Sequence, residues 1–158
     1  FYNENQQRMA LNYRAGFMQL ADHASRTEND KPKARSIMAQ MDETLPIDVI
    51  PVLDWRYMVY MMRLHESIDD TAKVNFYAAR VETKCREILA ANPTDGRSKS
   101  EAYQLLLEIY DAQKRYEPAL ELLQILLKEY PNDPEINRRI NSYREILNSA
   151  GRDTNKPG

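Results

Sequence analysis

The sequence predicts an all-α fold of about seven helices that pair as antiparallel hairpins. Apolar residues recur at three- and four-residue steps along most of the chain, which is the spacing of one helix face. Glycine occurs only 4 times in 158 residues, which disfavours a glycine-rich barrel or a disordered chain. The helix-patterned runs stop at Pro46, Pro93 and Pro131, and these recurring stops indicate a repeated unit.

The charge balance and the apolar pattern exclude several classes of partner. Lys and Arg (22) nearly equal Asp and Glu (24), so the chain lacks the basic surface of a nucleic-acid-binding protein and we expect no such partner. No run of ~18 apolar residues occurs, so we expect no direct membrane insertion by this segment. Because the chain starts at Phe1 and not at a methionine, we expect it to be a piece or a processed product of a longer protein.

A first hairpin is expected over about residues 5–46. Its first helix, over about 5–24, has an apolar face made of Met9, Tyr13, Phe17, Leu20, Ala21 and Ala24. Asp30 is placed to cap the second helix, and Pro46 ends it. The short polar turn between them is typical of two antiparallel neighbouring helices.

A second hairpin is expected over about residues 54–93. Asp54 is predicted as the N-cap of a helix that runs to about Glu66. Asp69 and Asp70 then place acidic groups at the start of a longer helix, where the helix dipole favours them.

A third hairpin, over about 98–131, and a capping helix, over 134–150, complete the predicted domain of residues 1–150. Ser98 and Glu101 have the spacing of a capping box at the start of the third hairpin. Its first helix carries Tyr103, Leu106, Leu107 and Tyr110 on one face. Its second helix is apolar around most of its circumference, so we expect neighbours to cover both sides.

The last helix has clear start and stop signals. Asp133 is predicted as its N-cap, and Pro134 occupies the first helical position, where its missing N–H costs nothing. Gly151 is predicted as its C-terminal stop, and residues 151–158 form a polar tail that we expect to be disordered.

The segment of residues 100–133 resembles a tetratricopeptide repeat. Its ordered pattern of aromatic, leucine, tyrosine, small, apolar and proline positions is Tyr103, Leu106, Tyr110, Ala119, Leu123, Leu126 and Pro131. Leu107 departs from the small residue of that family, which implies a wider helix crossing. The resemblance implies a right-handed superhelix whose concave groove binds partners. Gln104, Glu108 and Asp111 would face that groove and prefer a basic or amide-rich segment; the alternative is that they are only solvated surface residues.

The first two hairpins resemble the C-terminal region of the bacterial DUF2723 family of large polytopic membrane proteins, which is similar to protein O-mannosyltransferase-type glycosyltransferases. The positions that carry this resemblance are Asn12, Tyr13, Arg14, Phe17, Leu20, Ala21, Ala34, Met41 and Pro46. It implies that the chain is an extramembrane part, attached to a membrane through an N-terminal segment outside this sequence, on a side left open. The catalytic groups of the whole protein would then lie in that membrane part.

No residue set in the sequence predicts catalysis, a cofactor or a metal site. His23 and His65 lie on different predicted helices without other ligands at suitable spacing, and we expect both at the surface or its boundary. Cys85 is expected to be a buried structural cysteine. The few glycines do not form a phosphate-binding loop, so we predict that this domain is not an enzyme.

Residues 55–66, WRYMVYMMRLHE, contain the strongest candidate for a binding surface. Trp55, Tyr57, Tyr60 and three methionines share one helix, and a helix in a two-layer stack does not bury every face. Exposed Tyr and Met with Arg56 and Arg63 would form an adaptable surface for a peptide or a partner helix. The alternative is that both faces pack, one on the first helix and one on the fifth.

These observations together predict a non-catalytic interaction or scaffold domain. Its partner would be a protein, a peptide or the rest of its own parent chain. A free-standing soluble adaptor that binds a peptide remains the alternative.

Overall fold

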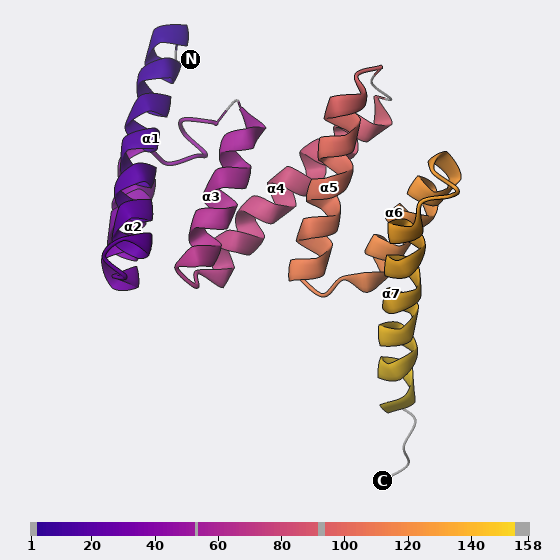
Figure 1. Cartoon of the computed structure of the whole chain (residues 1–158). Coiled ribbons are helices and arrows are strands. Elements are labelled where there is room, and N and C mark those ends of the chain that lie inside the picture. Colours follow the sequence, from indigo (N-terminus) through magenta and orange to yellow (C-terminus); the bar gives the residue numbers. More distant parts are fainter. Residues whose placement is uncertain (1–2, 53, 92–93, 154–158) are drawn as a thin grey trace. The chain divides into compact units, whose positions relative to one another are not determined.

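The computed structural model describes residues 3–52, 54–91 and 94–153. In this part of the chain there are seven α-helices and no β-strand, which confirms the predicted all-α fold (Figure 1). The helices are α1 (Glu4–Arg26), α2 (Lys31–Thr44), α3 (Trp55–Ser67), α4 (Thr71–Ala90), α5 (Gly96–Ala112), α6 (Tyr116–Glu129) and α7 (Pro134–Asp153). Pro93, the expected end of the second hairpin, and residues 154–158 of the expected tail lie outside the described residues.

The chain divides into two compact units, Phe1–Lys84 and Cys85–Gly158, which are called unit 1 and unit 2. Unit 1 contains α1, α2, α3 and most of α4, and unit 2 begins in the last part of α4. The single repeat domain and its right-handed superhelix therefore stay predictions.

Aspartate caps start the helices where the sequence predicted them. The Oδ1 atoms of Asp30, Asp54 and Asp133 accept backbone N–H groups of Lys33, Arg56 and Glu135 at 2.9, 3.0 and 2.8 Å. Pro134 is the first residue of α7, as expected. These caps satisfy backbone donors that have no partner inside the helix.

The predicted start of α5 and the predicted end of α7 are wrong. Asp95 and not Ser98 is the N-cap of α5, and Ser98 donates its hydroxyl to Asp95 Oδ2 at 2.6 Å. This hydroxyl, with the N–H groups of the first turn, lowers the pKa of Asp95. An aspartate was available three residues earlier, so the capping box does not form. At the other end, α7 continues past Gly151 to Asp153, because a glycine inside a helix weakens it without ending it.

Three turns between consecutive helices share one backbone geometry. Asn29, Asp69 and Lys114 have positive φ values of 53°, 58° and 55°. The next residue of each turn donates its N–H back to a carbonyl of the preceding helix, at 2.8, 2.9 and 2.8 Å. A residue with left-handed backbone conformation thus reverses the chain in each of the turns between α1 and α2, α3 and α4, and α5 and α6. Asp69 is therefore a turn residue, and Asp70 Oδ1 accepts the Lys73 N–H at 3.2 Å.

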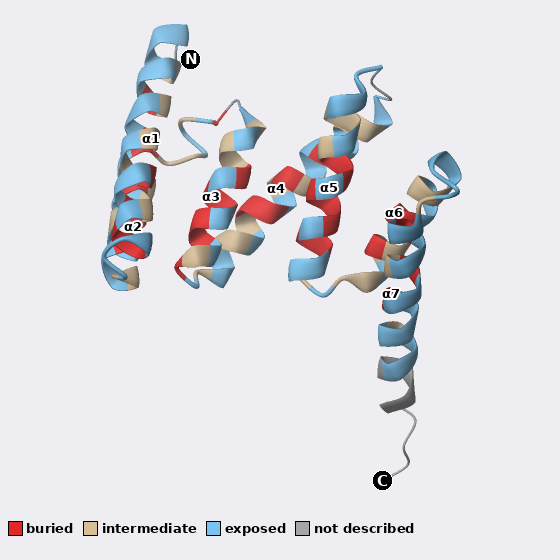
Figure 2. Cartoon of the chain, in the orientation of Figure 1, coloured by how far each residue is buried: buried red, intermediate tan, exposed pale blue. Residues whose placement is uncertain are grey.

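The buried face of α1 is not the predicted one. Ala21 and Ala24 are buried as expected, but Met9, Tyr13 and Leu20 are exposed and Phe17 is only half-buried. Figure 2 shows that exposed residues make up much of the α1 ribbon. The remaining buried residues of α1 are Ala10, Arg14, Met18 and Ser25. Small side chains bring α1 close to α2, where Ala34, Met38 and Met41 are buried.

Arg14 reaches from α1 to the segment that follows α2. Its Nη2 donates to the carbonyl of Leu45 at 2.9 Å and also to the carbonyl of Ile50. Burial lowers the pKa of Arg14, against the opposing effects of Tyr77 and Asp42. The guanidinium thus donates hydrogen bonds to two backbone carbonyls that have no partner within a helix. These bonds explain why a charged side chain is buried in this interior.

His65 is buried, which contradicts the expected surface position, whereas His23 is exposed. The Nδ1 atom of His65 lies 3.1 Å from Asp70 Oδ2, and its ring stacks on Tyr77 with 5.5 Å between centroids. Within the described part of the chain its Nε2 has no hydrogen-bond partner. Burial lowers the pKa of His65 below its ordinary value of 6.5, although Asp70 and Asp42 act to raise it.

Unit 2 has an apolar interior made mainly of leucine, isoleucine and tyrosine. The predicted face of α5, Tyr103, Leu106, Leu107 and Tyr110, is buried, and so is Cys85. α6 buries Ala119, Leu122 and Leu123 against its neighbours α5 and α7. The expectation that both sides of α6 are covered is wrong for the described residues, because Ile125 is 47% exposed.

Candidate functional site

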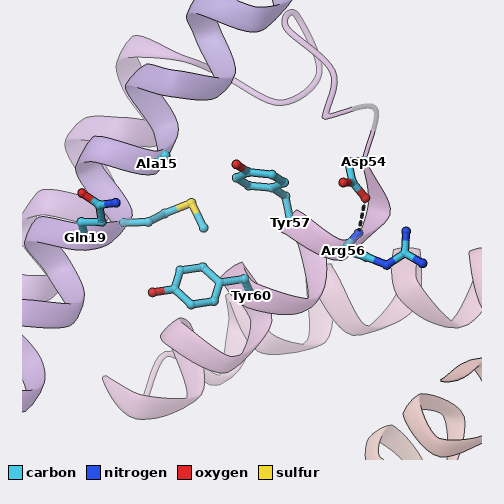
Figure 3. Close-up of a pocket in the computed structure, with 7 residues that line it drawn as sticks. Ala15, Gln19, Asp54, Arg56, Tyr57 and Tyr60 are labelled. Carbon is cyan, nitrogen blue, oxygen red and sulfur yellow. Dashed lines mark hydrogen bonds between the residues drawn. The ribbon is translucent and has the colours of Figure 1, made fainter.

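A pocket of about 320 Å³ lies between α1 and α3 in unit 1 (Figure 3). Its lining consists of Ala15, Met18, Gln19, Asp54, Arg56, Tyr57 and Tyr60. Three of the residues predicted for partner binding, Arg56, Tyr57 and Tyr60, therefore meet at one hollow. Arg63 is exposed on the same helix but does not line the pocket.

Helical spacing places the lining residues on facing sides of two helices. Tyr57 and Tyr60 are three residues apart, so both rings leave α3 on the side of α1, as Figure 3 shows. Ala15, Met18 and Gln19 have the matching spacing on α1. The contact between α1 and α3 thus supplies both walls.

The pocket has an apolar interior and a polar rim. Met18 is almost fully buried, Tyr57 is half-buried and Tyr60 is 42% exposed. Gln19 and Asp54 are exposed and add an amide and a carboxylate to the lining. An incoming group would therefore pass the polar atoms of the rim before it meets the aromatic faces and the thioether of the interior.

The two charged side chains of the lining differ in their orientation. Asp54 uses Oδ1 to cap α3, and no described donor bonds to its Oδ2. The guanidinium of Arg56 lies over Trp55, with 5.1 Å between the guanidinium carbon and the ring centroid. Figure 3 shows the Arg56 side chain extending away from the Tyr57 and Tyr60 rings. Asp54 is thus the charged group whose carboxylate stays available to the pocket.

The second predicted surface lies on α5 in unit 2. Gln104, Glu108 and Asp111 are all exposed there. Asp111 accepts hydrogen bonds from Arg139 at 2.7 Å and from the hydroxyl of Tyr143, and Arg139 also donates to that hydroxyl at 2.9 Å. Burial and the bond to Asp111 raise the pKa of Tyr143. Asp111 therefore joins α5 to α7, a role that its sequence position did not indicate.

The sequence reading missed the α1 side of the pocket. Ala15, Met18 and Gln19 have helical spacing, but the prediction assigned the buried face to the neighbouring stripe, which contains larger apolar residues. Asp54 was predicted only as a cap, and its cap position is what brings its carboxylate to the rim. Nothing in the sequence indicates which part of α1 opposes Tyr57 and Tyr60.

The described residues contain no group of three or more His, Cys, Asp or Glu side chains arranged to hold a metal ion. No helix in the same residues combines the length with the apolarity that a membrane crossing needs. Comparison of the chain with models of protein families, with curated proteins and with solved structures finds no match.

Proposed function

We propose that this chain is a non-catalytic protein-interaction domain that holds a segment of a partner protein against the pocket between α1 and α3. The observation that supports this proposal is the hollow of about 320 Å³ beside an exposed tyrosine. Tyr, Met and Arg are enriched in protein interfaces, and all three types line this pocket.

The size of the pocket favours one side chain of a partner over a whole cofactor. Its volume of about 320 Å³ is at the lower end of the ~300–1,000 Å³ range of small-molecule sites. The exposed side chain of Gln19 at the rim can then contact the neighbouring residues of the same segment. The α5 face is a weaker candidate, because the carboxylate of Asp111 already bonds Arg139 and Tyr143.

A peptide-display selection against the complete chain tests the proposal. Selected peptides should bind the wild-type chain, and Tyr60→Leu should weaken them by ~10-fold or more, as expected for a central interface tyrosine. Tyr130→Leu is the matched control, because Tyr130 is also an exposed tyrosine but lies in unit 2. Peptides that bind both variants equally well would contradict the proposal.

We also propose that the domain is the extramembrane part of a larger glycosyltransferase-like membrane protein. This proposal rests on the resemblance carried by the residues from Asn12 to Pro46. An antibody against the domain should then detect a protein much larger than 18.5 kDa that resists alkaline washing of native membranes. A soluble band near 18.5 kDa would favour the free-standing adaptor instead.

A further inference from the structure

We infer that the pocket between α1 and α3 takes a basic side chain, arginine or lysine, from the partner segment. This inference rests on the proposed function and specifies the chemistry of the partner. It depends on three features of the pocket: two tyrosine rings, a carboxylate at the rim, and the absence of any described cation of the chain over either ring.

The first feature is the aromatic wall. Tyr57 and Tyr60 both project from α3 toward α1 (Figure 3). A guanidinium or ammonium within ~6 Å of a tyrosine face is attracted by the negative face of the ring. Met18 adds a polarisable apolar contact for the methylene stem of such a side chain.

The second feature is the rim. Asp54 retains Oδ2 as an acceptor after Oδ1 has capped α3, and Gln19 presents an amide. The Asp54 carboxylate lines the same pocket as the two rings, so it attracts an incoming cation, and a charge-assisted bond to it is stronger than a neutral one. The Arg56 side chain extends away from the Tyr57 and Tyr60 rings (Figure 3), so its positive charge is directed away from an incoming cation.

The third feature is that the two rings of the pocket carry no cation of the chain, as is also true of Tyr13 and Tyr130, although cation–ring contacts form elsewhere among the described residues. Arg86 and Arg115 lie over Tyr110 at 5.9 and 4.9 Å, and Arg139 lies over Tyr143 at 5.7 Å. Lys73 and Arg80 lie over Phe76 at 5.4 and 3.6 Å. Among the described residues, no cation of the chain lies over Tyr57 or Tyr60. These two rings are therefore open to a cation from another molecule.

The test is an NMR titration of the isotope-labelled complete chain with blocked single amino acids. The probes are the N-acetyl, N-methylamide forms of arginine, lysine, norleucine and glutamate. We expect saturable shifts of the Ala15, Gln19, Tyr57 and Tyr60 amide signals with arginine and lysine. Norleucine, which has the aliphatic stem without the charge, should bind ~10-fold more weakly or not at all.

Conservative variants separate the contributions of charge and ring. Asp54→Asn keeps a good N-cap and removes the charge, so the arginine probe should bind ~3-fold more weakly. Tyr60→Leu should weaken it by ~5-fold through loss of the ring face. Asp133→Asn, at the N-cap of α7, is the control and should leave the affinity unchanged.

Each other outcome overturns the inference in a recognisable way. Equal or tighter binding of norleucine would make the pocket a simple apolar site, and preferred binding of glutamate would assign Arg56 the main role. Absence of saturable shifts with arginine up to its solubility limit also overturns it. In these cases the proposed function still stands if display-selected peptides depend on Tyr60, and it fails separately if they do not.

Discussion

The two compact units of the chain differ in what fills their interiors. All the buried polar or charged residues of the described chain, Arg14, Ser25 and His65, belong to unit 1, where buried methionines also gather. Unit 2 fills its interior with Leu105, Leu106, Leu123, Ile109 and similar apolar side chains. Unit 1 therefore relies on specific polar contacts, whereas unit 2 relies on close apolar packing.

This difference relates structure to the proposed function. Methionine adapts its shape more easily than leucine, and Met18 lies both in the interior of unit 1 and at the pocket. Arg14 meanwhile holds the carbonyls of Leu45 and Ile50 in the segment that leads to α3. Unit 1, whose interior contains buried polar and methionine side chains, thus carries the candidate binding site.

The largest expected effect is in the interior of unit 2. Leu123→Ala removes a buried side chain and leaves a cavity, which should lower the free energy of unfolding by about 3 kcal/mol. The neighbouring exposed Gln124→Ala should change it by less than about 0.5 kcal/mol. Urea unfolding followed by circular dichroism measures both. A loss below about 1 kcal/mol for Leu123→Ala would contradict close packing in unit 2.

The next effect tests the polar interior of unit 1. Arg14→Met keeps much of the side-chain volume but leaves two carbonyls without their donor, which should cost about 2–3 kcal/mol. Arg8→Met is the control in the same helix, because Arg8 is exposed and bonds only weakly to Asn5 at 3.4 Å. Equal stability of the two variants in urea unfolding would show that the Arg14 bonds do not stabilise unit 1.

A smaller effect should appear as pH dependence. Because the folded state lowers the pKa of His65 below 6.5, the unfolded chain binds this proton more readily. The contribution of His65 to stability is thus complete above about pH 6.5 and is lost as the pH falls below it. His65→Leu should flatten this part of the profile of unfolding free energy against pH. His23→Gln, which changes the exposed histidine, should retain the fall; the same profile in all three proteins would refute this account.

The smallest effect concerns the shared turn geometry. Lys114 has φ of 55°, which a lysine adopts at a cost, so Lys114→Gly should raise the unfolding free energy by about 0.5–1 kcal/mol. Asn29, at the equivalent position of unit 1, is a residue type that tolerates this region. Asn29→Gly should therefore change stability less than Lys114→Gly does. Thermal unfolding of both variants gives the comparison, and destabilisation by Lys114→Gly would contradict it.

The sequence predicted the helices better than it predicted which side of α1 is buried. Aspartate caps and proline positions are local signals, and the caps at Asp30, Asp54 and Asp133 form as expected. The buried face of α1 depends instead on partners 31 and 36 residues away, the carbonyls bonded by Arg14. A periodicity analysis counts an arginine as polar, and it therefore selected the larger apolar stripe that contains Tyr13 and Leu20.

The same limit applies to the candidate site. The crowding of Trp, Tyr and Met in residues 55–66 indicated one wall of the pocket. The other wall depends on how α1 packs against α3, which no local pattern encodes. Asp111 is a second example of this limit, since its bonds to Arg139 and Tyr143 join residues 28 and 32 positions apart.

NMR mapping of a display-selected peptide on the isotope-labelled chain decides whether the pocket between α1 and α3 is the binding site. We expect shifts to concentrate in unit 1, at Ala15, Gln19, Tyr57 and Tyr60, and we expect Gln104 and Glu108 of unit 2 not to respond. Shifts that concentrate on Gln104 and Glu108 instead, with the pocket signals unchanged, would contradict it.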